Sequence, residues 1–368
     1  MNRYNTIIKL EISFILIILL FFSFPLNLNS TDNTEINLKK IETYPKDEIK
    51  DYYFESLNDV EIYDKRLFAA ETFANSIAVF SVKGSTIKYI RSIGRRGQGP
   101  GDLVNPSKIS IWNREISVID NKAISFFKLD GTFLRKFRRF GGHKEYVYLE
   151  GLIYRKNANY EEPYLINVFT KEGKDFAKYG KKYINVDPSK FEGANPFFVA
   201  RILFRGNILT DGKHIYYLDA RFGNILKYSL KGEMITNKSV VGLFGKRGKM
   251  IYKKNKQNYI ENGINVTKTK GRYPSDFIFL DSYIYNSKIY LIGDNYVPGR
   301  SPNDYIEIIA IDVKTLNPIR HYKFNINSSD EIISFAVTKK LSSPLFLVSM
   351  ATEQGYIIGM YCHEDKIN

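Results

Sequence analysis

The sequence predicts an all-β fold, a six-bladed β-propeller of four-stranded antiparallel blades that follows an N-terminal signal segment. Three observations lead to this prediction. A short motif recurs six times along the chain, with irregular spacing between its copies. Each copy lies among short apolar segments with the alternation that is typical of strands. Aromatic residues make up 15% of the chain, with 27 Tyr and 26 Phe, and these residue types favour half-buried strands.

The recurring motif is an apolar strand that ends in an aromatic residue, then three residues, then a turn glycine. The four clear copies are Phe80–Gly84, Phe127–Gly131, Phe169–Gly173 and Tyr228–Gly232, and two copies without the glycine begin at Ile311 and Tyr361. Glycine supplies the positive φ that a hairpin turn needs, so each copy predicts a strand, a turn and another strand. Since about four short strands fit into each repeat, six motifs predict six radial blades.

The other strands of each repeat follow from the same spacing. A strand that ends in an acid precedes three of the motifs, at Glu71, Asp120 and Asp219, and we expect these carboxylates to bond turn amides. The predicted inner strands are Val60–Ile62, Ile109–Ile111, Tyr148–Leu152, Ile208–Thr210, Phe277–Leu280 and Ile332–Phe335. The last motif lies close to the end of the chain, so we expect Ile36–Ile41 to supply the outer strand of the last blade.

The segment of residues 1–30 has the pattern of a secretion signal. Arg3 and Lys9 precede an apolar run at positions 12–26, which is shorter than the roughly 20 residues of a membrane-spanning helix. Cleavage after Ser30 would release the propeller, residues 31–368, and an uncleaved anchor at residues 12–26 is the alternative. Either outcome places the domain outside the cytoplasm, in the periplasm or the extracellular space. The single cysteine, Cys362, excludes an intramolecular disulfide and a thiolate zinc cluster.

The formal net charge of +15 is spread over most of the chain, which favours solvated lysines over a polyanion site. Because the protein is expected to be exported, we expect no nucleic-acid partner. The segment of residues 245–272 is the exception, with nine Lys or Arg against one acid, Glu261. Its weak periodicity predicts an elaborated loop on one face of the propeller. That loop is the predicted place of any contact with a membrane surface.

The glycine-rich run Gly94–Asp102, followed by Asn105 and Pro106, resembles a segment found between the blades of bacterial six-bladed propellers related to NHL-repeat and TolB-like proteins. The NHL pattern of an acid, Asn, Ile and an aromatic residue is similar to Glu71, Asn75, Ile77 and Phe80, and the Arg of that pattern is absent. The resemblance implies the propeller fold and implies no particular activity.

The same run supplies the candidate ligand-binding residues, which are Arg95, Arg96, Gln98 and Asp102. Backbone amides and guanidinium groups bind oxyanions, so the loop could hold an anionic ligand. The structural alternative is a tight connection between blades that needs its glycines for its path. A phosphate-binding P-loop is excluded, because no Gly-Lys-Ser/Thr opens a helix here.

These features predict a non-enzymatic binding or scaffold propeller. We expect a monomer without a cofactor that binds a protein, peptide or glycan at a loop face or at the channel mouth. No catalytic residues are predicted, because the four His are scattered and no Gly-x-Ser-x-Gly motif is present. The alternative is a metal-dependent hydrolase, lactonase or lyase, whose divalent metal would lie in the channel. Its ligands would be Glu150 and Asp276, and Glu61 is the other acid assigned to an inner strand.

Overall fold

The computed structural model describes residues 35–45, 52–84, 86–121, 123–138, 145–157, 162–182, 203–261, 277–293, 305–327, 329–340 and 343–363. The chain divides into two units, residues 1–34 and residues 35–368. The first unit, and with it the predicted signal segment, lies outside the described residues. Within the described residues, no helix is long and apolar enough to cross a membrane.

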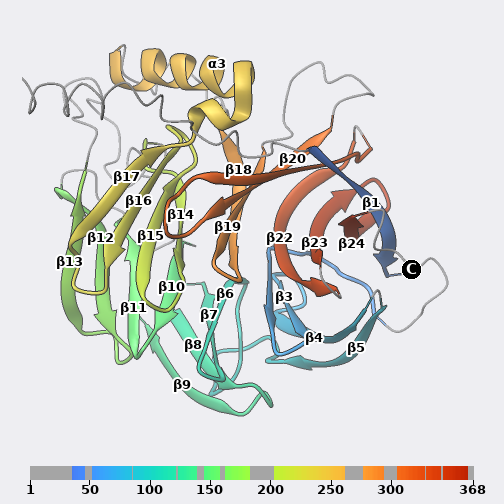
Figure 1. Cartoon of the computed structure of the whole chain (residues 1–368). Coiled ribbons are helices and arrows are strands. Elements are labelled where there is room, and N and C mark those ends of the chain that lie inside the picture. The colour runs from blue at the N-terminus through green and yellow to red at the C-terminus, as the bar shows by residue number, and fades with distance from the viewer. Residues whose placement is uncertain are drawn as a thin grey trace, which may run out of the picture. The chain divides into compact units, whose positions relative to one another are not determined.

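The second unit contains six blades, each a meander of four strands (Figure 1). Blade one is β2 (Asp59–Tyr63), β3 (Arg66–Glu71), β4 (Ser76–Lys83) and β5 (Thr86–Ile93). Blade two is β6 (Pro106–Trp112), β7 (Glu115–Asp120), β8 (Ala123–Lys128) and β9 (Phe133–Arg138). Blade three is β10 (Tyr146–Leu149), β11 (Leu152–Lys156), β12 (Tyr164–Thr170) and β13 (Asp175–Lys181).

The remaining blades follow the same order. Blade four is β14 (Gly206–Thr210), β15 (His214–Asp219), β16 (Asn224–Ser229) and β17 (Met234–Ser239). Blade five is β18 (Phe279–Tyr285), β19 (Lys288–Gly293), β20 (Ile306–Asp312) and β21 (Pro318–Phe324). Blade six is β22 (Glu331–Lys340), β23 (Ser343–Thr352), β24 (Gly355–His363) and β1 (Glu35–Tyr44). The six-bladed propeller of four-stranded antiparallel blades is therefore confirmed.

The inner strands of the blades form a closed ring around the channel. The contacts run from β2 to β6, β10, β14, β18 and β22, and β22 contacts β2 again. The apolar core lies between neighbouring blades, where large side chains such as Phe68, Phe127 and Tyr217 are fully buried. Burial of apolar surface between the blades is therefore the main term that stabilises the ring.

The recurring motif has a structural explanation that its sequence did not reveal. In all six blades the pairing register of the two outer strands shifts at the motif's first residue, which is a β-bulge. The turn glycines then adopt positive φ, for example +87° at Gly131 and +86° at Gly232. Gly232 also lies against the ring of Tyr179 on the preceding blade, where an added Cβ would be 2.3 Å from the ring. The motif therefore encodes both the bulge and the close packing of successive blades.

Blade six closes the ring by pairing the two ends of the domain. Strand β1 runs antiparallel to β24, with Leu38 opposite His363 and Tyr44 opposite Ile358. This confirms the predicted closure strand and extends it beyond Ile36–Ile41. The start of β1 also pairs in parallel with β21 of blade five, where Ile36 lies opposite Tyr322. The outer strand of the last blade thus links two blades, and their strands form one eight-stranded sheet.

The acids at the ends of the second strands have two different roles. Asp219 accepts hydrogen bonds from the turn amides of Arg221 and Phe222 at 2.8 and 3.0 Å, as predicted. For Glu71 and Asp120 the structure differs from the prediction. Their carboxylates accept the amides of Glu55 and Val104, which lie upstream in the segment that enters the same blade. These two acids hold the incoming chain against the end of the second strand.

The basic segment after blade four is helical, so the prediction of a loop is wrong for its first part. It contains η2 (Val241–Phe244), α3 (Gly245–Asn255) and the π-helix η3 (Lys256–Glu261). Its buried residues follow helical periodicity, at Gly248, Ile251, Asn255 and Tyr259. A glycine and an asparagine are among these four positions, and lysines surround them. The apolar periodicity is therefore weak, which explains why the sequence did not reveal the helix.

Candidate binding site at the channel mouth

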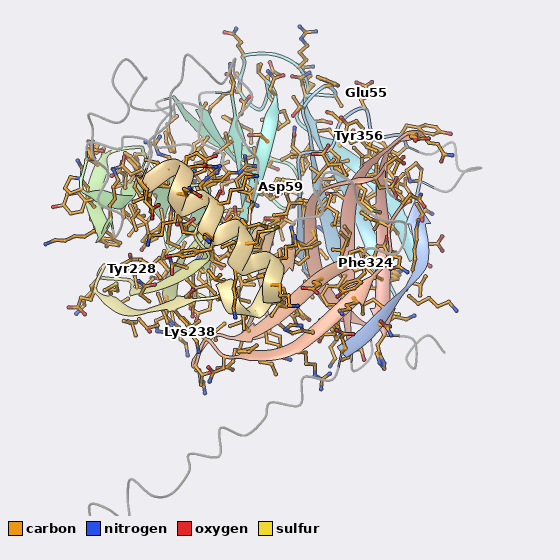
Figure 2. The ribbon with its side chains drawn as sticks, turned by 90° about the horizontal axis from the view of Figure 1, so that it is seen from above. Glu55, Asp59, Tyr228, Lys238, Phe324 and Tyr356 are labelled. Carbon is orange, nitrogen blue, oxygen red and sulfur yellow. The ribbon has the colours of Figure 1, made fainter. Side chains whose placement is uncertain are left out.

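Charged and polar side chains from the inner strands meet near the start of these strands. They are Asp59 and Glu61 on β2, Lys108 and Ser110 on β6, Asn207 on β14, Asp281 and Tyr283 on β18, and Ser334 on β22. We call this set the channel network. Figure 2, which looks onto the face that carries α3, labels Asp59 near the middle of the blades. Most members lie in the first half of their strand, so the network lies toward the end of the channel where the inner strands begin.

Asp59 is the most buried carboxylate of the network and links three blades. It accepts a hydrogen bond from the Lys108 ammonium at 2.8 Å and from the Ile109 amide at 2.8 Å. The hydroxyl of Ser334 donates to the same carboxylate at 3.2 Å. Asp59 is 2% exposed, whereas the side chain of Lys108 is 25% exposed. The ammonium therefore neutralises a buried charge and still reaches the channel.

Asp281 makes the corresponding connection between blades four, five and six. The side-chain amide of Asn207 donates to its Oδ1 at 2.8 Å, and its Oδ2 lies 2.9 Å from the Ser334 hydroxyl, whose single proton Asp281 shares with Asp59. The backbone amide of Phe335 also donates to Oδ2, at 3.3 Å. Buried polar groups of this kind hold neighbouring strands in fixed positions. A shift of one strand would leave a buried donor or acceptor without its hydrogen bond.

Tyr283 connects two blades that are not neighbours in the ring. Its hydroxyl donates to Oε1 of Glu61 at 2.8 Å, and it accepts the amide of Ile62 at 3.3 Å. Since blade six lies between blades five and one, this side chain reaches across the channel mouth. On the other side of Lys108, the hydroxyl of Ser110 on blade two accepts the backbone amide of Tyr148 on blade three at 3.1 Å, which links these two blades.

The electrostatics of the network follow from three carboxylates and one ammonium in a buried setting. Burial raises the pKa of Glu61 to about 7, with the charge of Lys108 opposing this shift and that of Asp59 adding to it. Burial also raises the pKa of Asp59, against the opposing effect of Lys108. Burial alone would lower the pKa of Lys108, but Asp59 and Asp281 hold it above its ordinary value. Three carboxyl groups therefore face one ammonium, burial disfavours the charged form of Asp59 and Glu61, and Glu61 is the part-exposed acceptor of the network.

The sequence anticipated only part of this network. Glu61 lies in it, but Glu150 is an exposed residue at positive φ in the turn between β10 and β11. Asp276 lies outside the described residues. Sequence reasoning missed Asp59, Asp281 and Lys108, because the predicted inner strands began one residue too late or ended one residue too early. Within the described residues, no group of three or more His, Cys, Asp or Glu is arranged to hold a metal ion.

The candidate ligand-binding loop forms a compact turn centred on Asp102. Its carboxylate accepts a hydrogen bond from Nε of Arg95 at 3.0 Å and from the Gly99 amide at 2.9 Å. An added Cβ at Gly97 would lie 2.2 Å from this carboxylate, so the glycines of the run make room for it. Of the remaining candidates, Arg96 is exposed and Gln98 is exposed as well. Asp102 and Arg95 therefore bond each other within the loop. Anion binding by this loop stays a prediction.

A separate cavity of about 560 Å³ lies at the outer rim of blade six. Its lining is largely polar and comes from the end of β1, the connection after β21 and the turn between β23 and β24. The lining residues that carry charge are Lys40, Glu42, Asp330 and Glu353. This cavity contains none of the buried groups of the channel network, so we place the candidate site at the channel mouth.

Comparisons with known proteins agree with this architecture. The profile of a family described as 6-bladed beta-propeller (DUF5128) matches residues 40–184. None of the curated proteins matches the chain. A solved structure of a Bacteroides fragilis protein that is described as exported aligns with a TM-score of 0.53 and 12% identity, over 92% of this chain and 97% of that chain.

Two further solved structures align with lower scores. The WD40 domain of Pan2 from Neurospora crassa gives a TM-score of 0.47 and 9% identity over 91% of this chain and 96% of that one. A streptogramin B lyase gives a TM-score of 0.44 and 11% identity over 88% of this chain and 86% of that one. The chain is a six-bladed β-propeller by its own sheets and by the family profile, and at 12% identity the Bacteroides fragilis structure bears on its fold alone. The relationship to NHL-repeat and TolB-like proteins stays a prediction.

Proposed function

We propose that this protein is an exported, non-enzymatic binding propeller that holds a protein or peptide ligand at the channel mouth. The ligand presents a cationic side chain, which enters the channel and pairs with Glu61. The observation that carries this proposal is the channel network, in which one ammonium faces three carboxylates. Export is supported by the charged start and short apolar run within residues 1–30, and by the likeness to an exported protein of the same fold.

The geometry favours binding because hydrogen bonds within the network hold its groups in fixed positions before a ligand arrives. Asp59 and Asp281 receive their hydrogen bonds from neighbouring blades, which holds them in fixed positions. Glu61 accepts the Tyr283 hydroxyl and is part-exposed, so it can meet a ligand at the mouth. A rigid mouth with one accessible carboxyl is suited to recognising a positive charge, because a cation placed beside Glu61 favours the charged form of that group.

The direct test is equilibrium binding of two fluorescent peptide pools to the purified protein. One pool carries a central Lys in an otherwise varied hexapeptide, and the other carries norleucine, which has the same aliphatic length and no charge. We expect tighter binding of the Lys pool in fluorescence anisotropy. Glu61→Gln should remove this preference, because it removes the accessible charge and keeps the side-chain size.

The matched control is Glu233→Gln, which makes the same charge change at an exposed turn of blade four. This variant should retain the preference for the Lys pool. Equal binding of both pools, or a preference that survives Glu61→Gln, contradicts the channel-mouth proposal. Export is checked separately by fractionating the native host cells, and recovery of the protein in the cytoplasm contradicts that part.

A further inference from the structure

The outer face of α3 is an unusually basic surface that the channel-mouth proposal does not use. Four residues at helical spacing lie on this face, namely Lys246, Lys249, Met250 and Lys253, and Lys254 adjoins them. All five are exposed, and Met250 is 63% exposed. The sequence of α3 contains no acidic residue. We call these five residues the α3 face.

The helix is fixed to the propeller by its opposite face. The Asn255 side chain donates to the carbonyl of Arg221 at 2.8 Å. Ile251 packs in the apolar cluster that joins blades four and five. The Arg221 guanidinium lies 4.5 Å from the centre of the Tyr259 ring, which adds a cation–π contact. Because the inner face is anchored in this way, the α3 face has a fixed orientation toward the surroundings (Figure 2).

The charges of α3 conflict with its own helix dipole. Lys246 lies in the first turn, where the dipole is positive and acidic residues are favoured. The residue before the helix, Phe244, provides no capping side chain. Charges that weaken a helix in the free protein are expected where binding of a partner offsets the lost helix stability. An anionic partner would do so here.

Met250 indicates what kind of anionic partner fits. A single exposed apolar side chain is common on protein surfaces, so Met250 bears on the partner because Lys246, Lys249 and Lys253 lie around it on the same face. Methionine adapts to irregular apolar surroundings, and the aliphatic stems of the flanking lysines extend the apolar area. A surface with phosphate groups above an apolar layer complements both features at once. That description fits a lipid bilayer better than an acidic glycan or a nucleic acid, neither of which has an apolar layer.

We propose that the α3 face docks the propeller onto a bilayer surface rich in anionic phospholipid, with Met250 entering the headgroup layer. This proposal does not depend on the channel-mouth proposal, because it uses other residues and another ligand. Each lysine held near an anionic bilayer contributes by electrostatic attraction that salt screens. Neutralising three lysines of the face should therefore weaken binding by about 100-fold.

The test is co-sedimentation of the full chain with vesicles of phosphatidylglycerol and phosphatidylcholine, compared with vesicles of phosphatidylcholine alone. We expect binding to the anionic vesicles that falls with added salt, and a loss of about 100-fold for the combined substitution of Lys246, Lys249 and Lys253 by Gln. The control combines Lys174→Gln, Lys231→Gln and Lys314→Gln, which removes the same charge from exposed turns on blades three to five. That control should bind nearly as well as the unchanged protein.

A second measurement reports the docking directly and does not rely on the triple variant. Met250→Cys is labelled with an environment-sensitive fluorophore, since the native Cys362 is buried. Anionic vesicles should shift the emission to shorter wavelength. Equal losses for the two triple variants, or no emission shift, overturn the proposal. Binding to a soluble sulfated glycan without binding to vesicles also overturns it and assigns the α3 face to a glycan.

Discussion

Replacing Lys108 by Met should destabilise the propeller strongly at neutral pH and only weakly in acid. Lys108 donates to the 2%-exposed Asp59 at 2.8 Å, so Lys108→Met leaves a buried carboxylate without its counter-charge. Breaking a buried ion pair by removing one partner costs about 3–5 kcal/mol. Asp59 keeps the Ile109 amide and the Ser334 hydroxyl, so we expect a loss of about 3 kcal/mol, at the lower end of that range.

The pH dependence of this loss follows from the carboxyl pKa. Without the ammonium, the pKa of Asp59 rises further above its already raised value in the folded state. The folded variant then binds a proton that the unfolded chain does not bind, so acid stabilises the variant relative to the unchanged protein. The difference in the free energy of unfolding should therefore shrink between pH 7 and pH 5.

Urea unfolding followed by the fluorescence of Trp112, the single tryptophan, measures both effects. Asp59→Asn combined with Lys108→Met should cost less than the sum of the two single changes, because the double variant no longer holds the buried Asp59 carboxylate without its ammonium partner. Lys88→Met, at an exposed position of β5, is the control and should change stability by less than about 0.5 kcal/mol. A cost below about 1 kcal/mol for Lys108→Met at pH 7, or the same cost at pH 5, would refute this reasoning.

Three other predictions concern the blades. Gly232→Ala should cost about 1–3 kcal/mol in urea unfolding, because the residue has a φ of +86° and the added Cβ meets the Tyr179 ring; an unchanged midpoint would show that the turn relaxes freely. Asp102→Ala should open the Gly94–Asp102 loop and speed trypsin cleavage after Arg95, measured as the rate of fragment formation, and an unchanged rate would contradict the role of this carboxylate. Burial raises the pKa of Glu71 and of Asp219 to about 7 in the folded protein. The protonated carboxyls therefore stabilise the fold in acid, fully below the ordinary carboxyl pKa, and this stabilisation is lost as the pH rises through about 7. Stability should accordingly fall between pH 5 and pH 8, and Glu71→Gln should reduce this fall; a stability that rises over this interval would disprove the assignment.

The repeated parts of the fold could be predicted because local rules determine them. A positive-φ glycine, an aromatic residue at the end of a strand and an alternating apolar pattern act over short stretches of chain. The motifs at Phe80 and Tyr228 therefore located their strands and turns correctly. The closure by β1 could also be predicted, since the last blade lacked an outer strand and Ile36–Ile41 was the available segment. The α3 helix could not, because its stability comes from docking onto blades four and five rather than from its own sequence.

By itself the sequence determined the all-β fold, the number of blades and the way the ring closes, since each depends on short-range patterns repeated along the chain. Only the tertiary structure decided which side chains meet at the channel mouth. Asp59, Lys108 and Asp281 come from blades one, two and five, far apart along the chain, and closure of the ring brings them into one network. Their strands resemble the other strands in sequence, so the pattern that built the blades carried no signal for the site.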